Sequence, residues 1–118
     1  MKIVITGGSG FLGSNLSNYI SKKNHEVIIL DNYYRNKNQI ISDKIKVFDV
    51  DIRNENLLIE KNKNADVLIH LAFINGTRYF YEKPELVLDV GVRGILNVVS
   101  AIKQNKIKAW KRHLRMTM

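Results

Sequence analysis

The sequence predicts an α/β fold of three layers, in which a doubly wound parallel sheet lies between helices. Short apolar runs alternate along the 118 residues with segments of helical periodicity, an arrangement typical of parallel sheets with right-handed crossovers. The first apolar run leads into a glycine-rich loop, and an acidic residue ends the second run. Four strands and three helices are expected, and they give an incomplete sheet with the spatial strand order 3-2-1-4.

The first strand comprises residues 3–5, and glycines follow it at positions 7, 8, 10 and 13. A pattern of period 3.6 then predicts a helix from about Leu12. Glycine permits a positive φ, close approach of the backbone to a pyrophosphate and tight packing of the helix on the strand. The helix N-terminus offers unpaired N–H groups to the phosphates. The loop therefore predicts a dinucleotide site, and the alternative is a glycine-rich turn without a ligand.

The second strand, residues 26–30, leads to Asp31, which lies 18 positions after Gly13. A carboxylate at this distance can accept hydrogen bonds from both hydroxyls of an adenosine ribose. It would repel a 2′-phosphate, so NAD is the predicted cofactor rather than NADP, although Arg35 lies close enough in the sequence to weaken that preference. The alternative role for Asp31 is that of a turn residue at a strand end.

Three further elements follow in order. Residues 44–50 alternate and predict a third strand. Asn54 is the expected N-cap of a helix that runs to about residue 62. Residues 66–72 form a nearly unbroken apolar run, typical of a strand buried on both faces, and His70 within it is expected to be a packed core residue. A loop containing Asn75 and Gly76 comes next.

The last predicted helix begins at Pro84, the only proline, and runs to about residue 104. Two glycines on its inner face indicate a close approach to the sheet or to a ligand, and the alternative is loose packing. The inner face comprises Val87, Gly91, Gly94, Ile95, Val98 and Ile102.

The net charge of +8 is unevenly distributed. Up to residue 89 the chain has 12 basic and 11 acidic side chains, whereas beyond it there are 7 basic and no acidic ones. The basicity therefore belongs to the C-terminal quarter. The absence of cysteine excludes disulfides and thiolate metal sites, and the three scattered histidines argue against a metal site. No signal peptide or membrane span is visible, so the expected location is cytoplasmic.

Several short sequence blocks occupy the loops and strand ends of the predicted sheet. They are residues 6–13 (TGGSGFLG), 31–32 (DN), 51–53 (DIR), 70–72 (HLA) and 94–98 (GILNV). With these blocks the chain resembles the extended short-chain dehydrogenase/reductases, in particular the NAD-dependent sugar-nucleotide epimerases and dehydratases. The resemblance covers residues 1–108 and implies a Rossmann-type domain that binds NAD.

The resemblance also implies a role for individual residues. Gly91 stands where the family usually has Asn, which puts that cofactor contact in doubt, and Ile95 replaces a common Thr. The implied cofactor-binding residues are Gly7, Gly10, Phe11, Leu12 and Gly13 at the pyrophosphate, Asp31 and Asn32 at the adenosine ribose, Asp51 (side chain) and Ile52 (backbone) at the adenine edge, and Leu71 and Ala72 beside the nicotinamide-side ribose.

No catalytic residue is assigned. The family uses a Ser or Thr with a Tyr-x-x-x-Lys pair, whose lysine lowers the tyrosine pKa. These residues lie after the family's fifth strand, whereas this chain continues from residue 109 with a basic sequence and stops. Three other Tyr-x-x-x-Lys matches occur where the nicotinamide is not expected: Tyr19/Lys23, Tyr33/Lys37 and Tyr79/Lys83.

Residues 109–118 are expected to be a basic tail, either disordered or a non-native continuation caused by a frameshift or premature stop. The edge of the fourth strand from Val67 to Leu71 would then be unpaired and apolar. Such an edge invites pairing with a complementing chain or with a second copy of this chain.

Three functions remain open from the sequence. The first is the NAD-binding N-terminal part of a sugar-nucleotide epimerase or dehydratase, which is not catalytic alone and meets the sugar nucleotide only in an intact homologue. The second is a short NAD-binding sensor or one half of a split enzyme. The third is a nucleic-acid binder that uses the basic C-terminal residues and stacks Trp110 on a base; a solvated helix end with a tail explains the same residues, so a nucleic acid is not the expected partner.

Overall fold

The computed structural model describes residues 1–32, 40–74 and 77–112. Arg35, the Tyr33/Lys37 pair, the Asn75-Gly76 loop and residues 113–118 lie outside this part of the chain. Within the described residues, no helix combines the length and the hydropathy that a membrane-spanning helix requires. The elements in chain order are β1 (Lys2–Thr6), α1 (Phe11–Ser21), β2 (Glu26–Asp31), β3 (Lys46–Asp49), α2 (Glu55–Lys61), β4 (Val67–His70), α3 (Thr77–Glu82), α4 (Pro84–Leu88), η1 (Asp89–Arg93), α5 (Gly94–Asn105) and β5 (Ala109–Arg112).

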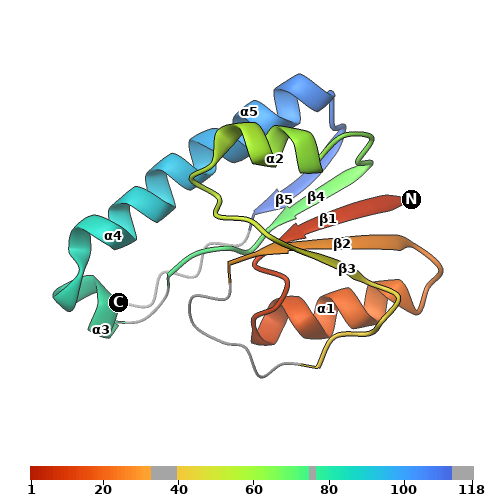
Figure 1. Ribbon diagram of the computed structural model, residues 1–118, viewed down its shortest axis with the longest axis horizontal. Helices are drawn as coiled ribbons and strands as arrows, with labels where there is room; N and C mark the ends of the chain where they lie inside the picture. Colours follow the sequence, from red (N-terminus) through yellow and green to blue (C-terminus); the bar gives the residue numbers. More distant parts are fainter. Residues whose placement is uncertain (33–39, 75–76, 113–118) are drawn as a thin grey trace.

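All five strands are parallel, in the order β3-β2-β1-β4-β5. The predicted order 3-2-1-4 is confirmed for the first four strands. Helix α1 covers one face of the sheet, while α2 and α5 lie together on the other (Figure 1). The carboxyl ends of the strands share one edge, and the start of α1 and the region of α4 and η1 lie toward that edge (Figure 1).

The core consists of two apolar layers, one on each face of the sheet. Along β1, Val4 belongs to the layer beneath α2 and α5, whereas Ile3 and Ile5 belong to the layer on the opposite face. In the first layer Leu58 of α2 and Val98 of α5 pack with strand residues and are almost completely buried. Two-sided burial explains why the strands read as nearly continuous apolar runs instead of alternating ones.

The prediction that the fourth strand has an unpaired edge is wrong. Strand β5 pairs with β4 in parallel along its whole length, from Val67 opposite Ala109 to His70 opposite Arg112. A parallel ladder uses backbone N–H and C=O groups. The strand can therefore form from Ala-Trp-Lys-Arg, which carries no apolar run that a pattern search detects. Residues 109–112 thus belong to the sheet.

The long helix predicted from Pro84 to about residue 104 is also corrected. The chain is helical over this range, but its middle, η1, is a π-helix between two α-helical segments. The buried side chains Val87 and Val98 confirm the expected inner face on either side of it. Helix α3 was not predicted. The expected cap of α2 is confirmed, since the Asn54 side chain accepts a hydrogen bond from the Leu57 N–H at 3.1 Å.

Candidate functional site

The glycine loop between β1 and α1 is a tight backbone structure at the carboxyl edge of the sheet. Gly7 has a φ of +71°, a conformation that only glycine adopts readily. A Cβ on Gly7 would lie 2.7 Å from the Ala72 nitrogen, and one on Gly13 would collide with the Gly7 carbonyl oxygen. The loop therefore brings three backbone segments into contact: the end of β1, the start of α1 and the chain after β4.

The N-terminus of α1 opens toward solvent at this edge. Gly10 is the N-cap, in an extended conformation, and its carbonyl accepts the Ser14 N–H at 2.8 Å. Helical geometry leaves the preceding N–H groups of the first turn without partners inside the helix. Phe11 and Leu12 in that turn are 74% and 52% exposed. An anion that approaches this end meets N–H groups and the positive end of the helix dipole.

A carboxylate closes the other side of the loop. Asp31 ends β2, and its Oδ2 accepts a hydrogen bond from the Ser9 N–H at 2.9 Å. Asn32 follows and is exposed. The Asp31 carboxylate thus lies directly beside the glycine loop, and its role at a ribose stays a prediction.

The segment after β4 is held against the loop by one buried hydroxyl. Thr6 Oγ1 lies 2.6 Å from His70 Nδ1 and accepts the Ala72 N–H at 3.3 Å. The Leu71 N–H donates to the Thr6 carbonyl at 3.0 Å. His70 is buried, as expected for a core residue. Leu71 and Ala72 therefore lie next to Gly7, and their expected place beside the nicotinamide-side ribose stays a prediction.

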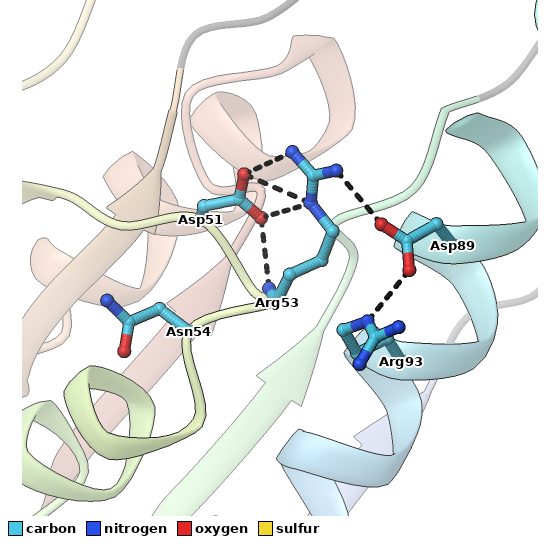
Figure 2. A pocket seen from close by; sticks show the side chains of 5 residues that line it. All are labelled: Asp51, Arg53, Asn54, Asp89 and Arg93. Atoms are coloured by element: carbon cyan, nitrogen blue, oxygen red, sulfur yellow. Dashed lines mark hydrogen bonds and ion pairs between the residues drawn. The ribbon is translucent and has the colours of Figure 1, made fainter.

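Asp51 and Arg53 follow β3 and form the most highly connected ion pair of the site (Figure 2). The Arg53 backbone N–H donates to Asp51 Oδ1 at 2.9 Å, and its Nη2 donates to Oδ2 at 2.7 Å. Arg53 Nε lies 3.1 and 3.2 Å from the two carboxylate oxygens. The hydrogen bonds from the Arg53 side chain hold the pKa of Asp51 below its ordinary value.

Two residues of η1 extend this pair into a chain of four alternating charges (Figure 2). Arg53 Nη1 donates to Asp89 Oδ2 at 3.0 Å, and Arg93 Nε donates to Asp89 Oδ1 at 2.7 Å. The bond from Arg93, and then that from Arg53, lowers the pKa of Asp89, while Asp51 and Asp89 together raise the pKa of Arg53. An open pocket of about 450 Å³ is lined by these four residues and Asn54.

Ile52 connects the same segment to α5. Its carbonyl accepts a hydrogen bond from Asn97 Nδ2 at 3.0 Å, and its side chain is buried. A Cβ on Gly94 would collide with that side chain. Gly94 and Asn97, which belong to one of the family blocks in the sequence, therefore fix the position of Ile52.

Gly91 contacts an aromatic ring. A Cβ at this position would lie 2.6 Å from Cε2 of Phe73, the residue that follows Ala72. Phe73 thus occupies the space that a side chain at position 91 would need. The sequence predicted that the helix glycines approach the sheet or a ligand closely. In the structure they approach side chains of the segments that follow two strands: Gly91 approaches Phe73 and Gly94 approaches Ile52.

The strand order places the candidate residues in a row. From β3 to β4 the carboxyl ends carry Asp51, Asp31, the glycine loop and Ala72 in that order. Adjacent strands are about 4.8 Å apart, so the row spans roughly three such spacings. Within residues 1–32, 40–74 and 77–112, no cluster of three His, Asp or Glu side chains is placed to bind a metal ion.

This row is positioned by four residues to which no role was assigned from the sequence: Thr6, Phe73, Asp89 and Arg93. Only Asp89 and Arg93 left a local signal, since they stand four positions apart on a helix, the spacing of an ion pair. The partners of Thr6 and of Asp89 lie 64 and 36 positions away in the chain. Such pairings depend on the tertiary fold.

Comparisons with known proteins agree with one another. The model of the NAD dependent epimerase/dehydratase family matches residues 3–114, and the match continues past residue 108, where the resemblance was expected to end. A UDP-N-acetyl-alpha-D-glucosaminuronate decarboxylase of Bacillus cytotoxicus is 32% identical over 91% of this chain and 34% of its own length. A UDP-glucose 4-epimerase of Klebsiella pneumoniae is 32% identical over 92% of this chain and 84% of its own length.

Among solved structures, the UDP-glucose 4-epimerase of Thermus thermophilus in complex with NAD is 26% identical. It has a TM-score of 0.85 over 93% of this chain and 36% of that protein. The chain spans about a third of the length of the first two curated relatives that it matches.

Proposed function

Because this chain belongs to the NAD-dependent epimerase/dehydratase family, we propose that it binds NAD along the carboxyl edge of its sheet. In this proposal residues 1–112 form the cofactor-binding part of an enzyme that acts on a sugar nucleotide. Bound NAD supplies a hydride acceptor for chemistry at a sugar carbon. The residues of this chain bind and orient the cofactor, and no catalytic role is proposed for any of them.

The order of the strand ends carries this proposal. NAD is a linear molecule: adenine, ribose, pyrophosphate, ribose and nicotinamide follow one another. The residues expected at these groups, Asp51, Asp31, the glycine loop and Ala72, lie along the sheet edge in the same order. A crevice outside the carboxyl ends of parallel strands is where open α/β sheets bind nucleotides.

Two features of the glycine loop fit a pyrophosphate, and Asp31 beside the loop fits the adjoining ribose. The N-terminus of α1 supplies N–H donors and a positive dipole end. A Cβ at Gly10 would have the Gly7 carbonyl oxygen, at 3.5 Å, as its nearest neighbour, so the space above Gly10 admits a ligand. Asp31 accepts the Ser9 N–H through one carboxylate oxygen, and the carboxylate can also take the ribose hydroxyls.

The test is a titration of the purified chain with NAD and with NADP by calorimetry. We expect NAD to bind more tightly than NADP, because Asp31 repels the 2′-phosphate. The Asp31→Ala variant should lose about tenfold or more in NAD affinity and most of the preference for NAD. Asp43→Ala, which removes an exposed carboxylate before the amino end of β3, is the matched control and should bind as the parent does. Failure of the parent chain to bind NAD would refute the proposal.

A further inference from the structure

The chain of charges between the segment after β3 and the π-helix is more elaborate than two surface ion pairs. Asp51, Arg53 and Asp89 have about a third of their side chains exposed, whereas Arg93 at the end of the chain is 64% exposed. The four charges alternate in sign, and each inner residue has a partner on both sides. Networks of this kind hold side chains in place more firmly than an isolated exposed pair does.

The hydrogen bonds leave Asp51 with limited capacity for another donor. An ionised carboxylate has about four acceptor positions. Three N–H-bearing groups of Arg53 take up three of them: the backbone nitrogen, Nε and Nη2. The fork of the guanidinium fixes the plane of the carboxylate, as in bidentate pairs. One acceptor position remains, in a direction that Arg53 sets.

Asp89 in turn determines how Arg53 lies. Besides its hydrogen bonds to Asp51, the Arg53 guanidinium is held at a second point. Its Nη1 is fixed by Asp89 at 3.0 Å, from a different element of the fold. Asp89 is the first residue of η1, and Arg93, the last, holds its other carboxylate oxygen. The widened π-helical turn therefore carries both residues that brace Arg53.

We propose that Arg53 is a positioning residue for the adenine end of the site. Arg53 orients the Asp51 carboxylate so that one acceptor position faces the exocyclic amino group of adenine. Asp89, from η1, holds the Arg53 side chain in place. This inference rests on the proposed binding of NAD and adds the specificity of that binding for an amino-bearing base. Neither Arg53 nor Asp89 contacts the cofactor in this arrangement.

The experiment compares NAD with nicotinamide hypoxanthine dinucleotide, in which a carbonyl oxygen replaces the amino group of adenine. A carbonyl cannot donate to Asp51, so the parent chain should prefer NAD by about tenfold. The Arg53→Lys variant keeps the positive charge but loses the planar fork, and the preference should fall to about twofold or less. Arg53→Ala should show the same loss of preference, with an additional loss of affinity for both dinucleotides.

The ratio of the two dissociation constants separates positioning from general weakening, because a merely structural or long-range charge effect changes both affinities alike. Asp89→Asn retains the Arg53–Asp51 pair and should reduce the preference about threefold, which tests the brace even if the Arg53 variants do not fold. An unchanged ratio in folded Arg53→Lys overturns the inference while NAD binding stands. A parent chain that binds both dinucleotides equally also overturns it, and a parent chain that binds neither refutes the proposed function itself.

Discussion

The two ends of the proposed cofactor site are built in different ways. At the glycine loop the backbone makes the contacts, and Gly7 and Gly13 have no room for a single additional carbon atom. At the other end, Asp51 and Asp89 are held by arginine side chains that solvent reaches. The pyrophosphate end therefore depends on close packing and the adenine end on charge. Substitutions at the two ends should therefore differ in size and in their response to salt and pH.

The largest effect is expected from Gly13→Ala. The added Cβ would collide with the Gly7 carbonyl oxygen and lie 2.6 Å from the Gly8 Cα. Both are backbone atoms, which cannot move aside as a flexible side chain can. Overpacking of this kind costs about 2–3 kcal/mol of unfolding free energy, measurable by urea denaturation monitored by circular dichroism.

Gly10→Ala is the matched control for that substitution. Gly10 has a φ of −71°, and its Cβ would have a nearest neighbour at 3.5 Å. The stability loss should stay below about 1 kcal/mol, the difference between glycine and alanine at an N-cap. Because the new methyl group enters the space proposed for the pyrophosphate, NAD affinity should nevertheless fall. Equal destabilisation by the two substitutions would contradict the packing argument.

Thr6→Val tests the hydroxyl that holds the chain after β4 against the glycine loop. The substitution removes the contact with His70 and the acceptor for the Ala72 N–H. Loss of these buried hydrogen bonds should cost roughly 1–3 kcal/mol. Thr6→Ser keeps the hydroxyl and loses one methyl group, worth about 0.8 kcal/mol. Denaturation curves should therefore rank Thr6→Ser as the more stable variant, and the reverse ranking would show that the hydroxyl is not essential.

Asn54→Ala examines a polar contact at the adenine end. The Asn54 side chain caps α2 immediately after Arg53, and loss of such a cap costs about 1 kcal/mol. Asn56→Ala, two positions further on at an exposed site of the same helix, has no capping role and should be neutral or slightly stabilising, because alanine is the better helix former. The melting temperatures of the two variants should differ accordingly.

The features that could be predicted from the sequence are local, whereas the missed ones depend on residues that are far apart in the chain. The glycine loop, Asp31 and the buried strands are local features, because their spacing reflects backbone conformation and two-sided burial. The cap at Asn54 is local as well. The strand–loop–helix arrangement, the cap at Asn54 and the order of the first four strands were predicted correctly, whereas the cofactor roles of the glycine loop and Asp31 stay predictions.

The missed features depend on residues that are distant in the chain or on backbone geometry without a side-chain signature. Arg53 and Asp89 meet only because α4 and η1 fold back toward the end of β3. The π-helical turn of η1 leaves the apolar positions Val87 and Val98 consistent with an ordinary α-helix. Strand β5 joins the sheet through its backbone, with a sequence of small, aromatic and basic residues.

The smallest expected effect is the pH and salt dependence of the stability that the charge network contributes. This effect distinguishes the adenine end from the glycine loop most directly. The pKa values of Asp51 and Asp89 lie below the ordinary value of 3.8 in the folded chain. A lowered pKa means that these pairs stabilise the fold above about pH 4 and that this contribution is lost as the pH falls through the lowered values. The stability difference between the parent and Arg53→Ala should therefore shrink below pH 4 and, at neutral pH, shrink in high salt, because ions screen exposed charges.

Gly13→Ala is the control. The stability difference between the parent and Gly13→Ala should stay constant under the same conditions, since a steric collision does not depend on charge. If salt and acid leave the Arg53→Ala difference unchanged, Arg53 stabilises the fold through the packing of its side chain, and the adenine end is built by packing as the glycine loop is.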